Sequence, residues 1–571
     1  MNLRSDRWVR GDDEVALDSR VALRMGGANV DAQGGRPIIG IANSASDLNP
    51  CNQPLDQLVA PLKQGVAEAG GIAVEFPVMS LGEDLMKPSS MLYRNLLAME
   101  IEESLRSQPL DAVIVLAACD KSVPGALMGA FSTNLPCLLV VSGPRPVAHF
   151  EGRRVGTGTD LWRLWDRRRA GELSNEQWAE LEAALTLGKG SCNTMGTAST
   201  MGGIAEALGL AWPGSTSIPA GDPRHLDIAR HVGRRSVELV RDDSGVSRQV
   251  TAEALDNATV VLSAIGGSTN AVIHLTAMAL RLGLTFDLDD VDRVSRRTPV
   301  LVDVEPSGSA LMEDLDAAGG FPTLFRALGD LLHPHVLLAD GKSTLETQSA
   351  ARTPNGVVRD LLTPIDAEGA FRVVRGNLAP GGALIKRSAA TTSLLSHRGP
   401  AYVIEGYDEI AKRTGAGSEC PADAILVLRG AGPVGGPGMP EWGMIPVPEP
   451  LLERGITDMV RVSDARMSGT SYGTVYLHAS PEAAVGGAIG LVKDGDIIRI
   501  DADAGVIELE VEEDELATRR LDTRPPFTSS RGYVDLYRRH VTQAPEGCDF
   551  DFLAQPTGLT PRLMEPVVGR S

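Results

Sequence analysis

The stretch VIVLAACDKSVPGALMGAF (Val113–Phe131) joins an apolar, strand-like run to an apolar, helix-like run. Between the two runs stand Cys119, Asp120 and Lys121, which carry a thiol, a carboxylate and an amine. Short apolar runs that alternate with helical stretches are typical of β-α-β units in a buried parallel sheet. Open sheets of this kind bind ligands in the loops at the carboxyl ends of their strands. We therefore expect the three reactive side chains to lie in such a loop.

Strand-like runs on both sides of this stretch extend the same pattern. Residues 37–42 (PIIGIA), 74–79 (VEFPVM) and 137–143 (CLLVVSG) are short and apolar, and polar loops or helix-like segments separate them. The polar, Trp-containing segment over residues 153–182 is predicted to be an inserted helical excursion. Together these patterns predict an α/β domain with a mainly parallel sheet over residues 1–370.

The pattern changes near residue 370. The runs AILVLRG, DMVRVSD, DIIRID and GVIELEVEE are short and β-branched, and Gly, Asp and Pro turns separate them. Such runs predict strands, and residues 496–501 and 505–512 predict a hairpin across the turn ADAG. We therefore expect residues 371–571 to form a second, β-rich domain, which is a small barrel or a sandwich.

The composition is that of a folded, acidic protein. Of the 571 residues, 43% are hydrophobic and 22% are charged, which is ordinary for globular domains. The formal charge of −20 provides no basic surface for nucleic acid. The apolar runs are too short to span a membrane, and the charged start MNLRSDRWVRGDDE lacks the apolar segment of a secretory signal. We therefore expect a cytoplasmic protein with no nucleic-acid or membrane partner.

Three of the six cysteines are candidates for chemistry. Cys51, Cys119 and Cys192 each stand in a loop or at a strand end, and Asn or Asp follows each of them. An isolated cysteine in a cytosolic protein is commonly a small buried apolar residue, and Cys137 in NLPCLLVV fits that description. Three thiolates from distant loops suit zinc or an iron–sulfur cluster that leaves one position for substrate. A chain of this size without a secretory signal is not expected to contain a disulfide framework. The absence of a CxxC pair argues against a compact structural zinc site.

A second group of candidates is polar. Glu83 and Asp120 fall in loops after predicted strands, and Glu441 lies in the Gly-rich run GAGPVGGPGMPEWGMIP. Carboxylates suit Mg²⁺, although acids in loops are more often simply solvated. The Gly-rich run lacks the GxxxxGK[ST] order of a phosphate-binding loop. Ser468, in MVRVSDARMSGTSYG, has no GxSxG motif around it, so turn formation or helix capping is the ordinary role of such a serine.

Taken together, the motifs carry a family resemblance. CDKSVPGALMGA and VRVSDARMSGTSYG resemble the two signature stretches of the dihydroxy-acid dehydratase and phosphogluconate dehydratase family. Further matching stretches extend over nearly the whole chain, and they are MLYRNLLAMEIEE, GKGSCNTMGTAS, GGSTNAVIHLTAMA, GGPGMPEWGM and DGDIIRID. Within the family, GSCNTMGTAS, MLYRNL and the insertion DLWRLWDRRRAGEL are most similar to the aldonic (sugar) acid dehydratases, such as those of arabinonate and xylonate.

The resemblance implies two metal centres and a fold. It implies a [2Fe–2S] cluster with one open iron, held by the three loop cysteines, Cys51, Cys119 and Cys192. It implies Mg²⁺ bound by oxygen ligands, namely Glu83, Asp120, Glu441 and a carbamylated Lys121. Ser468 corresponds to the family's proposed base, and Ser468 and Thr470 are expected to bind substrate. The implied fold is an α/β N-terminal domain with a β-barrel-like C-terminal domain, and the implied assembly is a homodimer or homotetramer.

The resemblance predicts a hydro-lyase that dehydrates a 2,3-dihydroxy sugar acid to a 2-keto-3-deoxy acid. The alternative substrate is the 2,3-dihydroxyisovalerate of branched-chain amino-acid biosynthesis, and hypotheses from other classes are a non-catalytic iron–sulfur protein and an interaction scaffold. Three departures from the family pattern bear on the substrate. Pro54 replaces a histidine after the first cysteine of many relatives, the tail PRLMEPVVGRS lacks a terminal histidine, and Asp84 competes with Glu83 as a metal ligand.

Overall fold

Four parallel strands form the centre of the N-terminal domain in the computed structural model, which describes residues 3–186, 188–521 and 531–554. The strand order is β2-β1-β3-β4, and every neighbouring pair is parallel. The strands are β1 Ile38–Asn43, β2 Ile72–Pro77, β3 Ala112–Leu116 and β4 Cys137–Val140. The predicted parallel sheet is thus confirmed, with β2 placed two residues earlier than its expected run.

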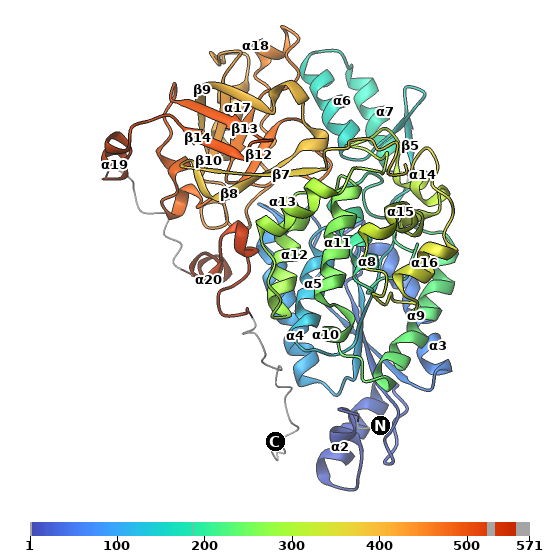
Figure 1. Ribbon diagram of the computed structural model, residues 1–571. Helices are drawn as coiled ribbons and strands as arrows, with labels where there is room; N and C mark the ends of the chain where they lie inside the picture. The colour runs from blue at the N-terminus through green and yellow to red at the C-terminus, as the bar shows by residue number, and fades with distance from the viewer. Residues whose placement is uncertain (1–2, 187, 522–530, 555–571) are drawn as a thin grey trace.

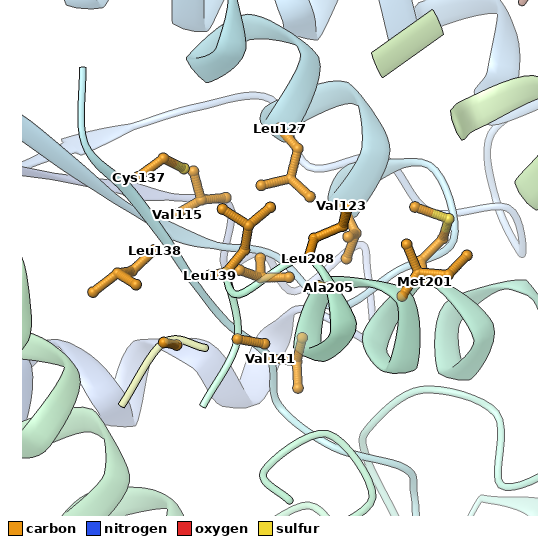
Figure 2. Packing of buried hydrophobic residues seen from close by; sticks show 14 of the residues in the cluster. Val115, Val123, Leu127, Cys137, Leu138, Leu139, Val141, Met201, Ala205 and Leu208 are labelled. Carbon is orange, nitrogen blue, oxygen red and sulfur yellow. The ribbon is translucent and has the colours of Figure 1, made fainter. Parts of the chain in front are cut away.

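Helices cover both faces of this sheet (Figure 1). Helices α3 (Val59–Glu68) and α9 (Arg224–Arg241) pack against each other on one face, and α4 (Arg94–Ser107), α5 (Ser122–Phe131) and α8 (Thr197–Ala207) lie on the other. Figure 2 shows Val115 and Leu139 of the strands together with Val123 and Leu127 of α5 and Leu208 at the end of α8. Because α5 and the inner strands are buried on all sides, their sequences are apolar without a polar face.

The helices of the N-terminal domain outside its insertion are α1 Asp6–Val9, α2 Glu14–Met25, α3 Val59–Glu68, α4 Arg94–Ser107, α5 Ser122–Phe131, α8 Thr197–Ala207, α9 Arg224–Arg241, α10 Val246–Gln249, α11 Ala252–Ala264, α12 Asn270–Arg281, α13 Leu288–Arg297, α14 Met312–Ala317, α15 Gly320–Leu328 and α16 Thr344–Ala350. Among the residues described, no helix combines the length and the apolar character that crossing a membrane requires.

The polar segment predicted as an insertion is a small helical unit. Strands β5 Ala148–Phe150 and β6 Arg153–Val155 form a ribbon that leads into α6 Thr159–Arg169 and α7 Asn175–Leu185. The unit has its own apolar cluster, which includes Leu164. In Figure 1 the two helices stand beside the C-terminal domain. The predicted helical excursion is therefore confirmed.

Eight strands form a closed barrel in the C-terminal domain, in the order β10-β11-β12-β8-β7-β14-β13-β9. Strands β9 to β12 are mutually parallel neighbours, and β13 and β14 form the predicted antiparallel hairpin. The strands are β7 Phe371–Gly376, β8 Ala379–Lys386, β9 Ser396–Glu405, β10 Ile425–Arg429, β11 Arg461–Ser463, β12 Val475–Ser480, β13 Ile497–Asp501 and β14 Val506–Leu509, with helices α17 Ile410–Thr414, α18 Glu449–Leu452 and α19 Glu513–Leu521 between or after them. The prediction of a barrel-like second domain is confirmed.

After the barrel the chain returns to the N-terminal domain. Helix α20 Tyr533–His540 buries Tyr537 in a cluster with Leu92 and Ile273 of the N-terminal domain. Further along, the backbone carbonyl of Cys548 accepts hydrogen bonds from the buried side chains of Arg94 and Asn95, each at 2.9 Å. The two domains are therefore tied by the tail as well as by their facing surfaces.

Candidate functional site

The three candidate cysteines lie in loops that meet at one edge of the parallel sheet. Cys51 follows β1, Cys119 follows β3, and Cys192 precedes α8. The backbone N–H of Gly190 donates to the carbonyl of Pro50 at 3.0 Å, which fixes the third loop against the first. Cys51 and Cys119 are each only 5% exposed, and their thiols lie within hydrogen-bonding reach of each other. The structure thus brings the three cysteines together from distant parts of the chain.

Asn52 holds two of these loops in place. Its Oδ1 accepts hydrogen bonds from the backbone N–H groups of Ala118 and Cys119, each at 3.0 Å. Its Nδ2 donates to the hydroxyls of Ser44 and Ser122, each at 2.9 Å. Asn52 is completely buried, so these bonds are formed in a low-dielectric surrounding where they are strong. In the sequence, the signal for this role is the asparagine directly after Cys51.

Burial shapes the thiol pKa values. The neighbouring Cys51 and burial raise the pKa of Cys119 well above its ordinary value, and burial raises the pKa of Cys192 to about 12. The guanidinium of Arg145 lies beside these thiols. Burial acts to lower the pKa of Arg145, but negative charge on Cys192 and Cys51 outweighs burial and raises this pKa above its ordinary value. Protonated thiols must lose their protons when they bind a metal. Two buried thiols and the half-buried Cys192, with one cationic neighbour, fit a cluster that carries its own positive charge.

The candidate carboxylates converge on the amine of Lys121. Lys121 is completely buried, and its Nζ donates to Asp120 Oδ2. The same Nζ lies 3.3 Å from Glu441 Oε1 and 3.4 Å from Glu83 Oε2. Asp84, by contrast, is exposed, and its charge acts on Arg145 and not on Lys121. Of the two neighbouring acids, Glu83 is thus the one that joins this group.

The charged side chains of this group shift one another's pKa values. Burial lowers the pKa of Lys121, but Asp120, Glu441 and Glu83 together raise it above its ordinary value. Burial raises the pKa of Glu83, yet Lys121 and Arg466 bring it down to about 2. The pKa of Asp120 instead rises to about 6, because burial and the two other carboxylates outweigh Lys121. Of Glu83 and Asp120, Asp120 is therefore the carboxylate that takes up a proton at the higher pH.

The donor set of this group suits Mg²⁺. Within residues 3–186, 188–521 and 531–554, no group of His, Cys, Asp and Glu side chains is spaced to hold a metal ion as it stands. In the carboxylate group the reason is Lys121, because its Nζ takes the point that the oxygens share. Carboxylate oxygens are the ligands that Mg²⁺ prefers, and a carbamate on Lys121 would replace its ammonium by an oxygen donor. With that modification, the residues present fit the ion.

The barrel contributes the second half of the site. Parallel strands β10 and β11 end side by side, and the loops after them carry Glu441 and Ser468. Glu441 Oε1 accepts hydrogen bonds from Arg466 Nη1 at 2.9 Å and from Asn270 Nδ2 at 2.7 Å. Asp464, at the end of β11, accepts the backbone N–H of Ala431 at 3.0 Å and so anchors the Glu441 loop. Two buried polar residues, Arg466 of the barrel domain and Asn270 of the N-terminal domain, thus orient the Glu441 carboxylate.

Ser468 and Thr470 lie together on the same loop. Their hydroxyls are 2.9 Å apart and share a hydrogen bond. The intervening Gly469 packs so closely on Ser268 that a Cβ would lie 2.7 Å from the serine hydroxyl. A Cβ on Gly196 would lie 2.8 Å from the Thr470 methyl group and 3.9 Å from Cys192 Cβ. Thr470 therefore lies between Ser468, to which it is hydrogen-bonded, and Gly196, which belongs to the segment that follows Cys192.

Two of the departures from the family pattern are Pro54 and the C-terminal tail. Pro54 lines a small cavity of about 130 Å³ behind the Cys51 loop, together with residues of the α9 N-terminus. The tail PRLMEPVVGRS lies outside the described residues.

The other cysteines lie apart from the site. Cys137 is in the core of β4, as predicted (Figure 2), Cys420 is in the barrel domain, and Cys548 contacts Met439.

Comparison with known proteins identifies relatives over nearly the whole chain. Residues 36–347 match the family described as dihydroxy-acid/6-phosphogluconate dehydratase N-terminal, and residues 356–548 match its C-terminal counterpart. A 6-deoxy-6-sulfo-D-gluconate dehydratase from Pseudomonas putida is 45% identical over 96% of both chains. An L-arabinonate dehydratase from Rhizobium leguminosarum bv. trifolii is 44% identical over 96% of both chains. A dihydroxy-acid dehydratase from Moorella thermoacetica is 37% identical over 90% of this chain and 94% of its own. The chain therefore belongs to the dihydroxy-acid/6-phosphogluconate dehydratase family and is a hydro-lyase.

Proposed function

We propose that the enzyme dehydrates a 2,3-dihydroxy sugar acid (an aldonate) to the 2-keto-3-deoxy acid. The observation that supports this most strongly is the meeting of three carboxylates on Lys121 next to Cys119, with Ser468 approaching from the barrel. Such a reaction needs a group that takes the proton from C2 and an environment that lets the C3 hydroxyl leave. Both requirements are met by residues that lie within this one site.

Two groups of residues would hold the cofactors that the family resemblance implies. Cys51, Cys119 and Cys192 would hold a [2Fe–2S] cluster. Mg²⁺ would bind to oxygen ligands, namely Glu83, Asp120, Glu441 and carbamylated Lys121. When bound, the two centres supply Lewis acidity, which stabilises negative charge at the substrate carboxylate and C2 oxygen and makes the C3 hydroxyl a leaving group.

The protein's own groups would perform the proton transfer. Ser468 Oγ, as the alkoxide, would take the C2 proton and then pass it to the C3 oxygen, which leaves as water and returns Ser468 to the alkoxide. Thr470, hydrogen-bonded to Ser468 at 2.9 Å, orients the serine hydroxyl toward the substrate. The enol that remains then tautomerises to the 2-keto-3-deoxy acid. Because Cys119 and Asp120 are adjacent in the chain, the backbone fixes the distance between the two ligand sets.

The choice of a sugar acid rests on the similar proteins and on the lining of the site. Relatives that are 44–45% identical include dehydratases named for arabinonate and for a sulfogluconate, whereas the dihydroxy-acid dehydratase of Moorella thermoacetica is 37% identical. Hydroxyl-bearing side chains form a connected network here: Thr197 Oγ1 bonds to Ser268 Oγ at 2.8 Å and to Asn270 Nδ2 at 3.1 Å. The alternative substrate is 2,3-dihydroxyisovalerate.

The proposal can be tested on protein purified without oxygen. We expect bound iron, turnover of C5 or C6 aldonates to a 2-keto acid, and loss of iron in Cys119→Ser. Activity on 2,3-dihydroxyisovalerate alone would establish the alternative. Lack of iron in the wild-type protein would exclude the cluster, and activity unaffected by removal of Mg²⁺ would exclude the magnesium site.

A further inference from the structure

The inserted helix α6 forms one wall of the proposed active site. Thr159 Oγ1, at the start of α6, donates to the backbone carbonyl of Thr470 at 2.8 Å. Gly158 has φ +94°, and a Cβ on it would lie 2.4 Å from Thr470 Oγ1. Since Thr470 is hydrogen-bonded to Ser468, the segment of residues 156–163 is only one side chain away from the proposed base.

An ion pair joins this wall to the loop beside Cys192. Glu305 is 8% exposed, and its Oε1 accepts a hydrogen bond from Arg163 Nη1 at 2.9 Å. Its backbone carbonyl accepts the N–H of Met195 at 2.8 Å, three residues after Cys192. The carboxylate therefore stands between the cluster-side loop and the insertion.

The second carboxylate oxygen of Glu305 is not used. In the part of the chain that the structure describes, Oε2 is buried and has no hydrogen-bond partner. It faces the same wall, because a Cβ on Gly156 would lie 2.6 Å from it and 2.8 Å from the Thr194 methyl group. A buried acceptor without a donor is disfavoured in a folded protein, so such an atom calls for an explanation. A bound ligand with hydroxyl groups would supply the donor.

Arg163 complements this acceptor with donors. Its guanidinium lies over the ring of Tyr472, 5.3 Å from the centroid, and its side chain is 45% exposed. It also bonds to Asp160 Oδ1 at 3.0 Å. The pair therefore offers a fixed acceptor and a partly free donor at the same place. A sugar acid carries hydroxyl groups beyond C3, whereas the branched-chain acid ends in methyl groups that can satisfy neither.

We propose that Glu305 and Arg163 bind the hydroxyl groups at the far end of the sugar acid, beyond the two carbons that react, and so select polyhydroxylated substrates. This inference rests on the proposed function. It assigns to the insertion a task in recognition: α6 brings Arg163 to Glu305 and fixes Thr470 through Thr159.

The test compares substrates on the holoenzyme and on three variants, Glu305→Gln, Glu305→Leu and Arg163→Met. For C5 and C6 aldonates we expect kcat/KM to fall about 10- to 100-fold in Glu305→Leu, mainly through KM, because a hydrogen bond to a charged group is lost. Glu305→Gln retains an acceptor and should fall less. Turnover of 2,3-dihydroxyisovalerate should be unchanged or should increase. Protection against thermal unfolding by the aldonates should weaken in parallel.

The matched control is Glu313→Gln. Glu313 pairs with Arg154 of the same insertion at 2.6 Å, but its side chain is 42% exposed at the surface. Losing that pair should leave the substrate preference unchanged. Two results would overturn the inference. One is an equal loss of kcat/KM on every substrate together with a lowered melting temperature in the Glu305 variants, which would show that Glu305 has only a structural role. The other is unchanged kinetics in these variants. If the wild-type enzyme turned over no aldonate at all, the proposed function itself would fail.

Discussion

Asn52 Oδ1 lies 3.0 Å from the backbone nitrogen of Cys119, so one side-chain amide from the first cysteine loop fixes the second. The two thiols belong to segments that are far apart in the chain, and neither loop has regular structure of its own to hold it. The amide also reaches the hydroxyl of Ser122 at the start of α5, which follows Lys121 directly. One residue thus links both proposed metal centres to the sheet.

Replacing Asn52 by Ala should therefore damage stability and iron binding together. Several buried donors and acceptors lose their partner, and we expect a loss of about 2–4 kcal/mol in the free energy of unfolding. Iron content after anaerobic purification should fall as well. The control is Asn257→Ala, which removes a buried amide bonded to the backbone of His333 and should lower stability without loss of iron. Full iron content in Asn52→Ala would contradict the assigned role.

Ser468→Ala should abolish most of the turnover while leaving the rest of the site assembled. If Ser468 takes the proton from C2, kcat should fall about 10²- to 10⁴-fold, with iron and magnesium content unchanged. Thr470→Val, which removes only the hydroxyl bonded to Ser468, should have a smaller effect. Ser463→Ala, which alters a hydroxyl that accepts the N–H of Ala465 at 2.9 Å, is the comparison. Near-normal kcat in Ser468→Ala would rule out its role as the base.

Lys121→Met tests whether the three carboxylates share one cation. Without metal, the variant leaves Asp120, Glu441 and Glu83 without their central positive charge, and we expect a loss of about 3 kcal/mol of stability. Because the variant also lacks the amine that would carry the carbamate ligand, adding Mg²⁺ should raise its melting temperature by less than it raises that of the wild type. Lys63→Met, which breaks the exposed pair with Glu75, should respond to Mg²⁺ as the wild type does. An equal response in both variants would argue against a shared site.

The buried amine of Lys386 should make the free energy of unfolding depend on pH. It is completely buried at the end of β8, and burial lowers its pKa to about 7. In the unfolded chain the amine keeps a pKa near 10.4, so between about pH 7 and 10 the unfolded state binds more protons. The contribution of Lys386 to stability therefore rises with pH through this window, by about 1.4 kcal/mol per pH unit at most.

Lys386→Met removes this titration and should be more stable than the wild type at pH 7 and below. The advantage should shrink as the pH approaches 10, as denaturant unfolding at several pH values would reveal. A difference in unfolding free energy that stays constant from pH 6 to pH 10 would show that the amine keeps its ordinary pKa in the folded protein.

The sequence allowed the strands of the parallel sheet and the second, β-rich domain to be predicted, because buried strands leave a local pattern of short apolar runs. It could not yield the strand order of the barrel, since β8 pairs with β12, β9 with β13 and β7 with β14, which lie far apart in the chain. The candidate site residues came from motifs and from the family resemblance. Their supports did not: Arg466, Asn270 and Asn52 act through contacts between distant segments, and Glu305 lies in a loop whose importance appears only beside the insertion.

The return of the tail to Arg94 has a consequence for biosynthesis. Arg94 stands at the start of α4 and is completely buried, and the carbonyls of Gly547 and Cys548 accept its Nη2 at 2.8 and 2.9 Å. Domains generally fold in order as they leave the ribosome. Here the first domain to emerge keeps a buried guanidinium without these two acceptors until almost the entire chain has been translated. The hydrogen bonding of this buried side chain is therefore completed only after the barrel and the returning segment have been synthesised.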